Sequence, residues 1–376
     1  MKKKLSSMIL IVVLALTLKI VQPVSAVSQY SVVDLGTLGG GRSIAYDINT
    51  RGQVVGDSET ATGENHAFIW EDDILSDLGT LGGTLTSVRA INEAGQVIGM
   101  GETELGEIHA FIWQNGVMTD LGTFGGGYSF ASAINKHGQV VGDSRTDSDD
   151  YHAFLWQDDV MRDLGTLGGN SSGASAINDR GQVVGGSETA SGEFHAFLWQ
   201  NDTMIDLGTL GGSYSSAAVI NQRGQVIGMS ENASGELHAF IWQDGGMIDL
   251  GTLGGMYSDA VDINNHGQIV GTSQAVLDEF EYHPYLWQNG IMLDLESLGG
   301  DYSFASDINA GGQIVGGSTN FSESMQRAFI WQQGVMTELA GLGGNNSLAM
   351  ALNERGQIVG FSDTASGESH AVLWTK

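Results

Sequence analysis

Short runs of alternating hydrophobic and polar residues recur along the whole chain. The stretch 195–210 is a clear example, in which His-Ala-Phe-Leu-Trp-Gln is followed by a polar turn and then by a second short run. Alternation with a period of two predicts β-strands. Phe197 and Trp199 fall on one face of such a strand, and Ala196 and Leu198 fall on the other. Both faces are apolar, so we expect both to be covered by neighbouring sheets.

The same pattern returns with a period of about 43 residues. An asparagine in the turn Ile/Leu-Asn-x-x-Gly-Gln keeps this period throughout the chain. The eight tryptophans lie 43 to 45 residues apart, at Trp70, Trp113, Trp156, Trp199, Trp242, Trp287, Trp331 and Trp374. A repeat this regular indicates an array of similar units that stack on one another.

Each unit predicts four short strands. In the fourth unit we expect them at residues 172–177, 182–187, 195–200 and 204–210, with a tight turn at Gly181. Helices are not expected, because the chain has 56 glycines and each costs about 1 kcal/mol inside a helix. Four strands in about 43 residues match a β-propeller blade, whereas solenoid coils are usually shorter.

The two ends of the chain are offset by one strand. The last unit stops at its third strand, residues 370–374, whereas residues 30–36 form a spare fourth strand before the first unit. A ring can use this offset, because the N-terminal strand completes the last blade and removes unpaired strand edges. The sequence therefore predicts an all-β fold, an eight-bladed β-propeller that forms a single domain over residues 27–376. The N-terminal strand lies on the outer edge of its last blade.

Residues 1–26 have the pattern of a cleaved secretory signal peptide. Three lysines at residues 2–4 precede an 11-residue apolar run at 8–18 and the small residues of 24–26. Eleven residues are too few for a transmembrane helix, which needs about 20. We expect a bacterial protein that is secreted or periplasmic, with no membrane insertion after signal cleavage. An uncleaved anchor is the alternative.

Charge and cysteine content narrow the possible partners. The formal net charge is −29, and loss of the lysines in residues 1–26 makes the chain more acidic still. Phosphate backbones and anionic membranes should repel such a protein, which disfavours nucleic-acid and membrane-surface roles. Charged residues are only 16% of the chain, so disorder is not indicated. No cysteine is present, which excludes disulfides and thiolate zinc sites. We expect a monomer.

A His-Ala-Phe triplet opens the third strand of five units, at His66, His109, His152, His195 and His238. These residues resemble the HAF-repeat family of bacterial repeat proteins, and the resemblance covers residues 30–374. The sequence departs from the triplet at 283–285, 327–329 and 370–372. The resemblance implies export and repetition, and it brings no established activity or catalytic residue with it.

The recurrent histidine of strand three and the recurrent aspartate of strand four favour a structural role. A ring of imidazoles could bind metal or respond to pH, but neighbouring blades would hold them too far apart to share one ion. We expect each histidine to bond to the serine of strand two or the aspartate of strand four. Glycosidase chemistry needs two carboxylates in distinct environments, whereas rotated copies repeat a single environment.

Positions that vary between units are better candidates for binding. The loops between strands two and three, and between strands four and one, are the longer ones and share a rim. On this rim, near the channel mouth, we expect ligand contacts from Arg42, Tyr128, Tyr214, Tyr257 and Tyr302, and from Tyr282 and Phe321 beside the lengthened loops of units six and seven. Tyrosines at such positions can stack on sugar rings or engage a partner protein.

An acidic series also follows this rim, just before the third strands. Its densest part is Asp147, Asp149 and Asp150, which calcium could use. A solvated rim is the alternative interpretation of this series. No other cofactor is expected.

The sequence predicts a secreted, non-enzymatic binding module that recognises an extracellular carbohydrate or protein. A propeller-fold polysaccharide lyase or glycosidase is the alternative, as is a structural matrix or surface component. Few unrepeated basic residues are present, which weakens the enzyme hypothesis.

Overall fold

The computed structural model describes residues 29–276, 280–319 and 325–376, and all of its regular elements in these ranges are β-strands. The expected signal peptide, residues 1–26, and the candidate Phe321 lie outside the described residues. None of the described residues belongs to a helix with the length and hydrophobicity needed to cross a membrane.

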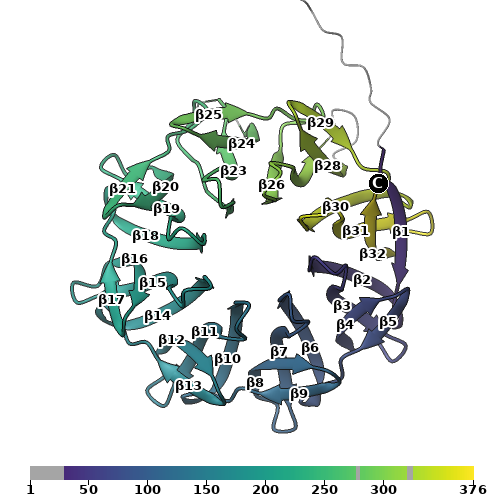
Figure 1. Ribbon diagram of the computed structural model, residues 1–376, viewed down its shortest axis with the longest axis horizontal. Coiled ribbons are helices and arrows are strands. Elements are labelled where there is room, and N and C mark those ends of the chain that lie inside the picture. Colours follow the sequence, from purple (N-terminus) through teal and green to yellow (C-terminus); the bar gives the residue numbers. More distant parts are fainter. Residues whose placement is uncertain (1–28, 277–279, 320–324) are drawn as a thin grey trace, which may run out of the picture.

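The strands form four-stranded antiparallel blades in chain order. In Figure 1 the blades stand around a common axis, with the first strand of each blade nearest to that axis. The all-β fold with four-stranded blades is therefore confirmed. The first four blades are β2 (Gly39–Ile48), β3 (Val54–Thr60), β4 (Asn65–Glu71), β5 (Ile74–Asp77); β6 (Gly82–Ile91), β7 (Val97–Thr103), β8 (Ile108–Gln114), β9 (Val117–Asp120); β10 (Gly125–Ile134), β11 (Val140–Thr146), β12 (Tyr151–Gln157), β13 (Val160–Asp163); β14 (Gly168–Ile177), β15 (Val183–Thr189), β16 (Phe194–Gln200), β17 (Thr203–Asp206). The blades that follow are β18 (Gly211–Ile220), β19 (Val226–Asn232), β20 (Leu237–Gln243), β21 (Gly246–Asp249); β22 (Asp262–Ile263), β23 (Ile269–Gln274), β24 (Tyr282–Gln288), β25 (Ile291–Asp294); β26 (Ser303–Ile308), β27 (Ile314–Thr319), β28 (Gln326–Gln332), β29 (Val335–Glu338); and β30 (Gly343–Leu352), β31 (Ile358–Thr364), β32 (Ser369–Thr375) with β1 (Ser31–Gly36).

Two strand boundaries in the fourth blade differ from expectation by four residues, and the others differ by two residues or fewer. The first strand, β14, starts at Gly168 and so begins earlier than residue 172, because Gly168 already pairs with Thr189 of β15. The fourth strand, β17, ends at Asp206 and not at residue 210. There the Asp206 carboxylate accepts the amide hydrogen of Gly208 (2.7 Å), and Gly208 has a φ of 74°, which turns the chain out of the strand.

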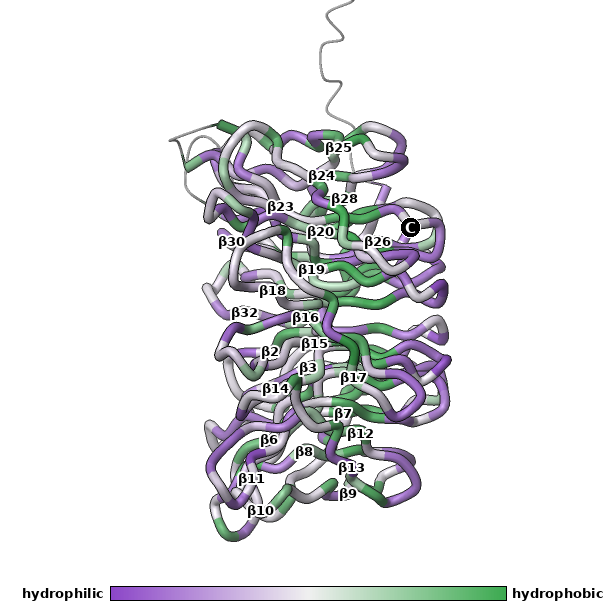
Figure 2. The backbone as a smooth tube through the Cα atoms, turned by 90° about the vertical axis from the view of Figure 1, so that its left-hand side faces the viewer, coloured by the Kyte–Doolittle hydropathy of each residue, from purple (hydrophilic) through white to green (hydrophobic). Residues whose placement is uncertain are grey.

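The hydrophobic core lies in the seams between blades. Phe197 and Trp199 pack against Val141 and other residues of the preceding blade. Ala196 and Leu198, on the opposite face of the same strand, pack against the following blade. Figure 2 shows the result from the side, with hydrophobic segments in the middle of the disc and hydrophilic segments along both rims. The prediction that the tryptophans fill the seams is confirmed for Trp199.

A glycine inside each second strand allows the blade to pack closely. A Cβ atom at Gly56 would overlap the carbonyl oxygen of Ile44 on the first strand and would lie 2.7 Å from Cζ of Phe68. Only glycine fits between these two neighbours.

The two ends of the chain meet in one blade. β1 pairs antiparallel with β32, with Val32 opposite Trp374, and Figure 1 shows the two strands side by side. This pairing confirms the expected position of the N-terminal strand.

A circuit of asparagines also links each blade to the next. The Nδ2 atom of each turn asparagine donates to the backbone oxygen of the next one at 3.0–3.2 Å, in the order Asn49, Asn92, Asn135, Asn178, Asn221, Asn264, Asn309, Asn353 and back to Asn49.

Candidate functional site

The expected rim residues lie over the seams between blades. Arg42 pairs in parallel with Ser369, and Tyr214 pairs in the same way with Phe194. Each partner is the first or second residue of the third strand of the preceding blade. The first strand of a blade therefore begins beside the third strand of the preceding blade. That these side chains gather at the channel mouth and bind a ligand stays a prediction.

Three of the expected aromatic residues form a continuous row with one further ring. Ring centroids lie 6.1 Å apart for Tyr257 and Tyr282, 5.9 Å for Tyr282 and Tyr302, and 5.7 Å for Tyr302 and Phe304. We call these four residues the aromatic row. It crosses from the sixth blade to the seventh, and Tyr302 is 48% exposed. Phe304 was missed, although its position holds small or aliphatic residues in most other units.

The other expected aromatic residues stand apart from the row. Tyr214 stacks on Phe194 with an interplanar angle of 14°, and Tyr128 meets Tyr151 edge-on at 5.7 Å. Arg42 lies in the seam between the last blade and the first. The rim thus carries several separate aromatic groups, of which the aromatic row is the largest.

Asp259 forms a hydrogen bond with one tyrosine of the aromatic row. The hydroxyl of Tyr257 donates to Oδ2 of Asp259 (3.1 Å), and the buried Tyr285 hydroxyl donates to the Asp259 backbone oxygen (2.7 Å). Burial raises the pKa of Asp259, and burial together with the Asp259 charge raises the pKa of Tyr257. The Tyr257 hydroxyl therefore remains a hydrogen-bond donor with a fixed direction.

Asp143 is a second half-buried carboxyl on this rim. Burial raises its pKa to about 6. Asp57, at the same position of the first blade, bonds to the Ser87 hydroxyl (2.6 Å) of the next blade. Asp143 faces Gly173 instead, and its carboxylate has no hydrogen-bond partner among the described residues. Asp143 therefore lacks the hydrogen bond that partly offsets the effect of burial on the pKa of Asp57.

The acidic cluster considered for calcium is only partly free. Asp149 forms an ion pair with Arg145 (2.9 Å), and its amide closes a turn onto the Thr146 oxygen (3.1 Å). Within residues 29–276, 280–319 and 325–376, no group of three or more histidine, aspartate or glutamate side chains is arranged to hold a metal ion. Calcium binding at Asp147, Asp149 and Asp150 stays a prediction.

The recurrent histidines bond to the recurrent aspartates of strand four, as expected. The Nδ1–carboxylate distances are 2.8–3.0 Å for His66, His109, His152, His195, His238, His283 and His370. His370 takes its partner, Asp34, from the N-terminal strand. The hydrogen bond that His283 donates to the Asp294 carboxylate raises the pKa of His283. Each pair ties a third strand to a fourth strand.

The inner strands hold a set of carboxyls that the sequence did not single out. Asp307 accepts the amide hydrogen of Leu352 (2.8 Å), and Asp262 accepts that of Ile308 (3.2 Å). The two carboxyls also hydrogen-bond to each other, and burial raises the pKa of both. We therefore expect them to share a proton. Most other units have alanine or valine here, and that contrast was the available signal.

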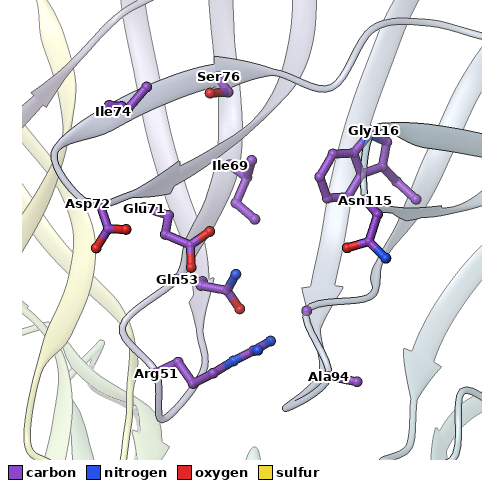
Figure 3. A pocket seen from close by; sticks show the side chains of 12 residues that line it. Arg51, Gln53, Ile69, Glu71, Asp72, Ile74, Ser76, Ala94, Asn115 and Gly116 are labelled. Carbon is purple, nitrogen blue, oxygen red and sulfur yellow. The ribbon is translucent and has the colours of Figure 1, made fainter.

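A pocket opens on the opposite rim, which carries the short turns. It lies between the first and second blades and has a volume of about 480 Å³. Figure 3 shows Arg51, Gln53 and Glu71 along one wall, with Ala94 and Asn115 of the next blade opposite. Trp113 also lines it. The sequence analysis looked for binding residues on the other rim and missed this site.

Comparison with known proteins gives the fold and no family. No family model matches the chain. No curated protein matches it either. Among solved structures, dipeptidyl peptidase 4 of Porphyromonas gingivalis is similar with a TM-score of 0.59 and 12% identity, over 90% of this chain and 58% of that one. A puromycin-hydrolyzing peptidase of Mycobacterium tuberculosis has a TM-score of 0.51 and 13% identity, over 86% of this chain and 58% of that one.

A third similar structure is the β-propeller domain of the Trilobed protease from Pyrococcus furiosus, with a TM-score of 0.46, 10% identity, and coverage of 89% of this chain and 93% of that one. This chain spans little more than half of either peptidase, since it covers 58% of each. At these identities the likeness shows the propeller fold alone.

Proposed function

We propose that this chain is an exported, closed eight-bladed β-propeller that binds a neutral extracellular carbohydrate through the aromatic row. Residues 1–26 direct export and are removed, and residues 27–376 act as one non-enzymatic binding domain. The pairing of β1 with β32 and the bond from Asn353 to Asn49 support the closed ring.

The aromatic row is the observation that carries the proposal. Tyr282 touches Tyr257 on one side and Tyr302 on the other, so the rings form a platform that spans two blades. Sugar rings stack on aromatic faces of this kind, and the tyrosine hydroxyls can bond to sugar hydroxyls. Tyr282 and Phe304 lie in strands, and single β-bridges hold Tyr257 and Tyr302 to the neighbouring third strands, which limits the conformational entropy lost on binding.

Charge decides which carbohydrates are favoured. The protein has a formal net charge of −29, and Asp259 lies directly beneath the row. Uronic-acid and sulfated polysaccharides should be repelled at long range, so neutral glycans are the better ligands.

Binding to a glycan array tests this proposal. We expect the chain from residue 27 onward to bind neutral glycans, and Tyr302→Ala to weaken that binding about tenfold or more, as expected for a central aromatic contact. Tyr302 is 48% exposed, so its removal should leave the fold intact. Tyr151→Ala is the matched control, because Tyr151 is 40% exposed and belongs to a separate pair.

Undiminished glycan binding by Tyr302→Ala would remove the aromatic row from the site. Capture of a protein ligand without any glycan binding would favour a protein partner, and assembly of the chain with itself would favour a matrix role.

The enzyme alternative has one observation in its favour, the proton-sharing pair Asp262 and Asp307. Glycosidases separate their two carboxyls by about 5–9.5 Å, whereas these two are in direct hydrogen-bond contact. Each also accepts a backbone amide hydrogen, which suits a bracing role. Release of new reducing ends from the bound glycan, lost in Asp307→Asn, would support the enzyme instead.

A further inference from the structure

The pocket on the rim of short turns is built from positions where the repeat is broken. It lies at the seam between β4 and β5 of the first blade and β8 of the second (Figure 3). A volume of about 480 Å³ falls within the usual range for small-molecule sites. Similar seams recur between the other blades, and several residues at this one differ from their counterparts.

Ser76 and Trp113 both line the pocket, and Trp113 is half-buried. At the seam between the third and fourth blades, Arg162 of the fourth strand covers the tryptophan of the next blade. Its Cζ atom lies 5.1 Å from the centroid of the Trp199 ring, and Trp199 is only 7% exposed. Ser76 is too short to cover Trp113 in this way, and it is smaller than its counterparts at Val33, Thr119, Arg162, Ile205, Ile248, Leu293 and Thr337. The pocket therefore has an aromatic wall.

Gln53 supplies an unused donor in this pocket. In six other blades the corresponding glutamine donates from Nε2 to a glutamine at the end of the third strand, as Gln139 does to Gln157 (2.7 Å). In the first blade Glu71 replaces that partner, and no bond joins Gln53 to Glu71.

Gln53 is only 7% exposed, and its Oε1 is held by Asn49 (2.7 Å). Its Nε2 has no acceptor in the part of the chain that the structure describes. A ligand acceptor could therefore bond to Nε2 without displacing a partner within the protein.

Arg51 adds a cation that no carboxylate neutralises. Its guanidinium reaches across the seam, where a Cβ at Gly95 would lie 2.7 Å from Nη2. Among the described residues it forms no ion pair, although the protein is strongly acidic. Glu71 and Asp72 also line the pocket, so both signs of charge are present. An ammonium ligand would meet Arg51, and a carboxylate ligand would meet Glu71 and Asp72.

We propose that this pocket binds one neutral pyranose residue. The apolar face of the sugar stacks on Trp113, and its hydroxyls bond to Gln53 Nε2, the Glu71 carboxylate and the Arg51 guanidinium. A pyranose matches this set because it joins an apolar face to hydroxyls that both donate and accept. The site lies on the rim opposite the aromatic row and does not depend on it.

Titration with free monosaccharides tests the site. The probes are glucose, galactose, mannose, fucose and N-acetylglucosamine, with glucuronate as the charged comparison, and the readouts are tryptophan fluorescence and ligand-detected NMR. We expect saturable binding of at least one neutral sugar and weaker binding of glucuronate.

Two variants restore features of the other seams. Ser76→Arg places an arginine as at Arg162, and Glu71→Gln recreates the glutamine pair, so both should weaken binding about tenfold or more. Thr119→Arg, at the next seam, is the matched control and should bind as the unaltered protein does. Absence of binding by every sugar, or unchanged binding by Ser76→Arg with a normal Tm, would overturn the proposal. Loss of binding in Tyr302→Ala alone would instead place the monosaccharide on the aromatic row.

Discussion

Removal of the N-terminal strand should destabilise the whole ring. Truncation of residues 27–36 takes away two buried side chains, Tyr30 at 5% and Leu35 at 6% exposure. Burial of a large apolar side chain contributes about 1.5–3 kcal/mol, so the two account for about 3–6 kcal/mol. Loss of the bond from His370 to Asp34 adds about 1 kcal/mol. The total is a large part of the 5–15 kcal/mol by which domains are typically stable.

Calorimetry on the intact and truncated proteins measures this loss. We expect Tm to fall by about 10 °C or more, and the truncated protein to associate through the exposed edge of β32. A synthetic peptide of residues 29–36, added in trans, should recover part of the lost Tm if strand pairing is the cause. Equal melting of both proteins would refute the reasoning that β1 completes the last blade.

Two further predictions concern single side chains. The pKa of Asp143 in the folded protein, about 6, lies above the ordinary value of 3.8, so its neutral form stabilises the fold below pH 3.8 and this contribution is lost as the pH rises through about 6. Asp143→Asn should therefore raise Tm at about pH 8 and leave it unchanged below pH 3.8; an equal effect at both pH values would contradict the burial argument. His195→Ala removes the bond to Asp206 (3.0 Å) and should lower the free energy of unfolding by about 1–2 kcal/mol in urea titrations. An unchanged unfolding midpoint would show that this histidine does not brace the blade.

Much of the fold was predictable because the repeat gives the same information many times. The spacing of tryptophans such as Trp199 showed the length of the repeat, and period-two alternation placed Phe197 and Leu198 on opposite faces of their strand. The offset ends identified the pairing of β1 with β32. The ends of the strands were less predictable. Gly168 belongs to β14 through one isolated pair with Thr189, and no hydrophobic pattern in the sequence indicates this pair.

The candidate sites depend on features that the pattern does not encode. The sequence pointed to Tyr257, Tyr282 and Tyr302, but only their cross-blade pairing brings them together in one row. The pocket is lined mainly by turn residues together with the short Ser76, and these residues form no motif that sequence reasoning could recognise. Asp307 was hidden in a different way, because the register shift after Ala305 disturbs the alternation that sequence reasoning relies on.

The asparagine circuit makes the starting point of the chain arbitrary. Asn353 bonds to Asn49 as every other turn asparagine bonds to its successor, so this ring of contacts has no first or last member. A gene that joined residue 376 to residue 29 by a linker and opened the chain in a different loop would keep the whole circuit. The asparagine contacts between blades would then be the same for any position of the chain break.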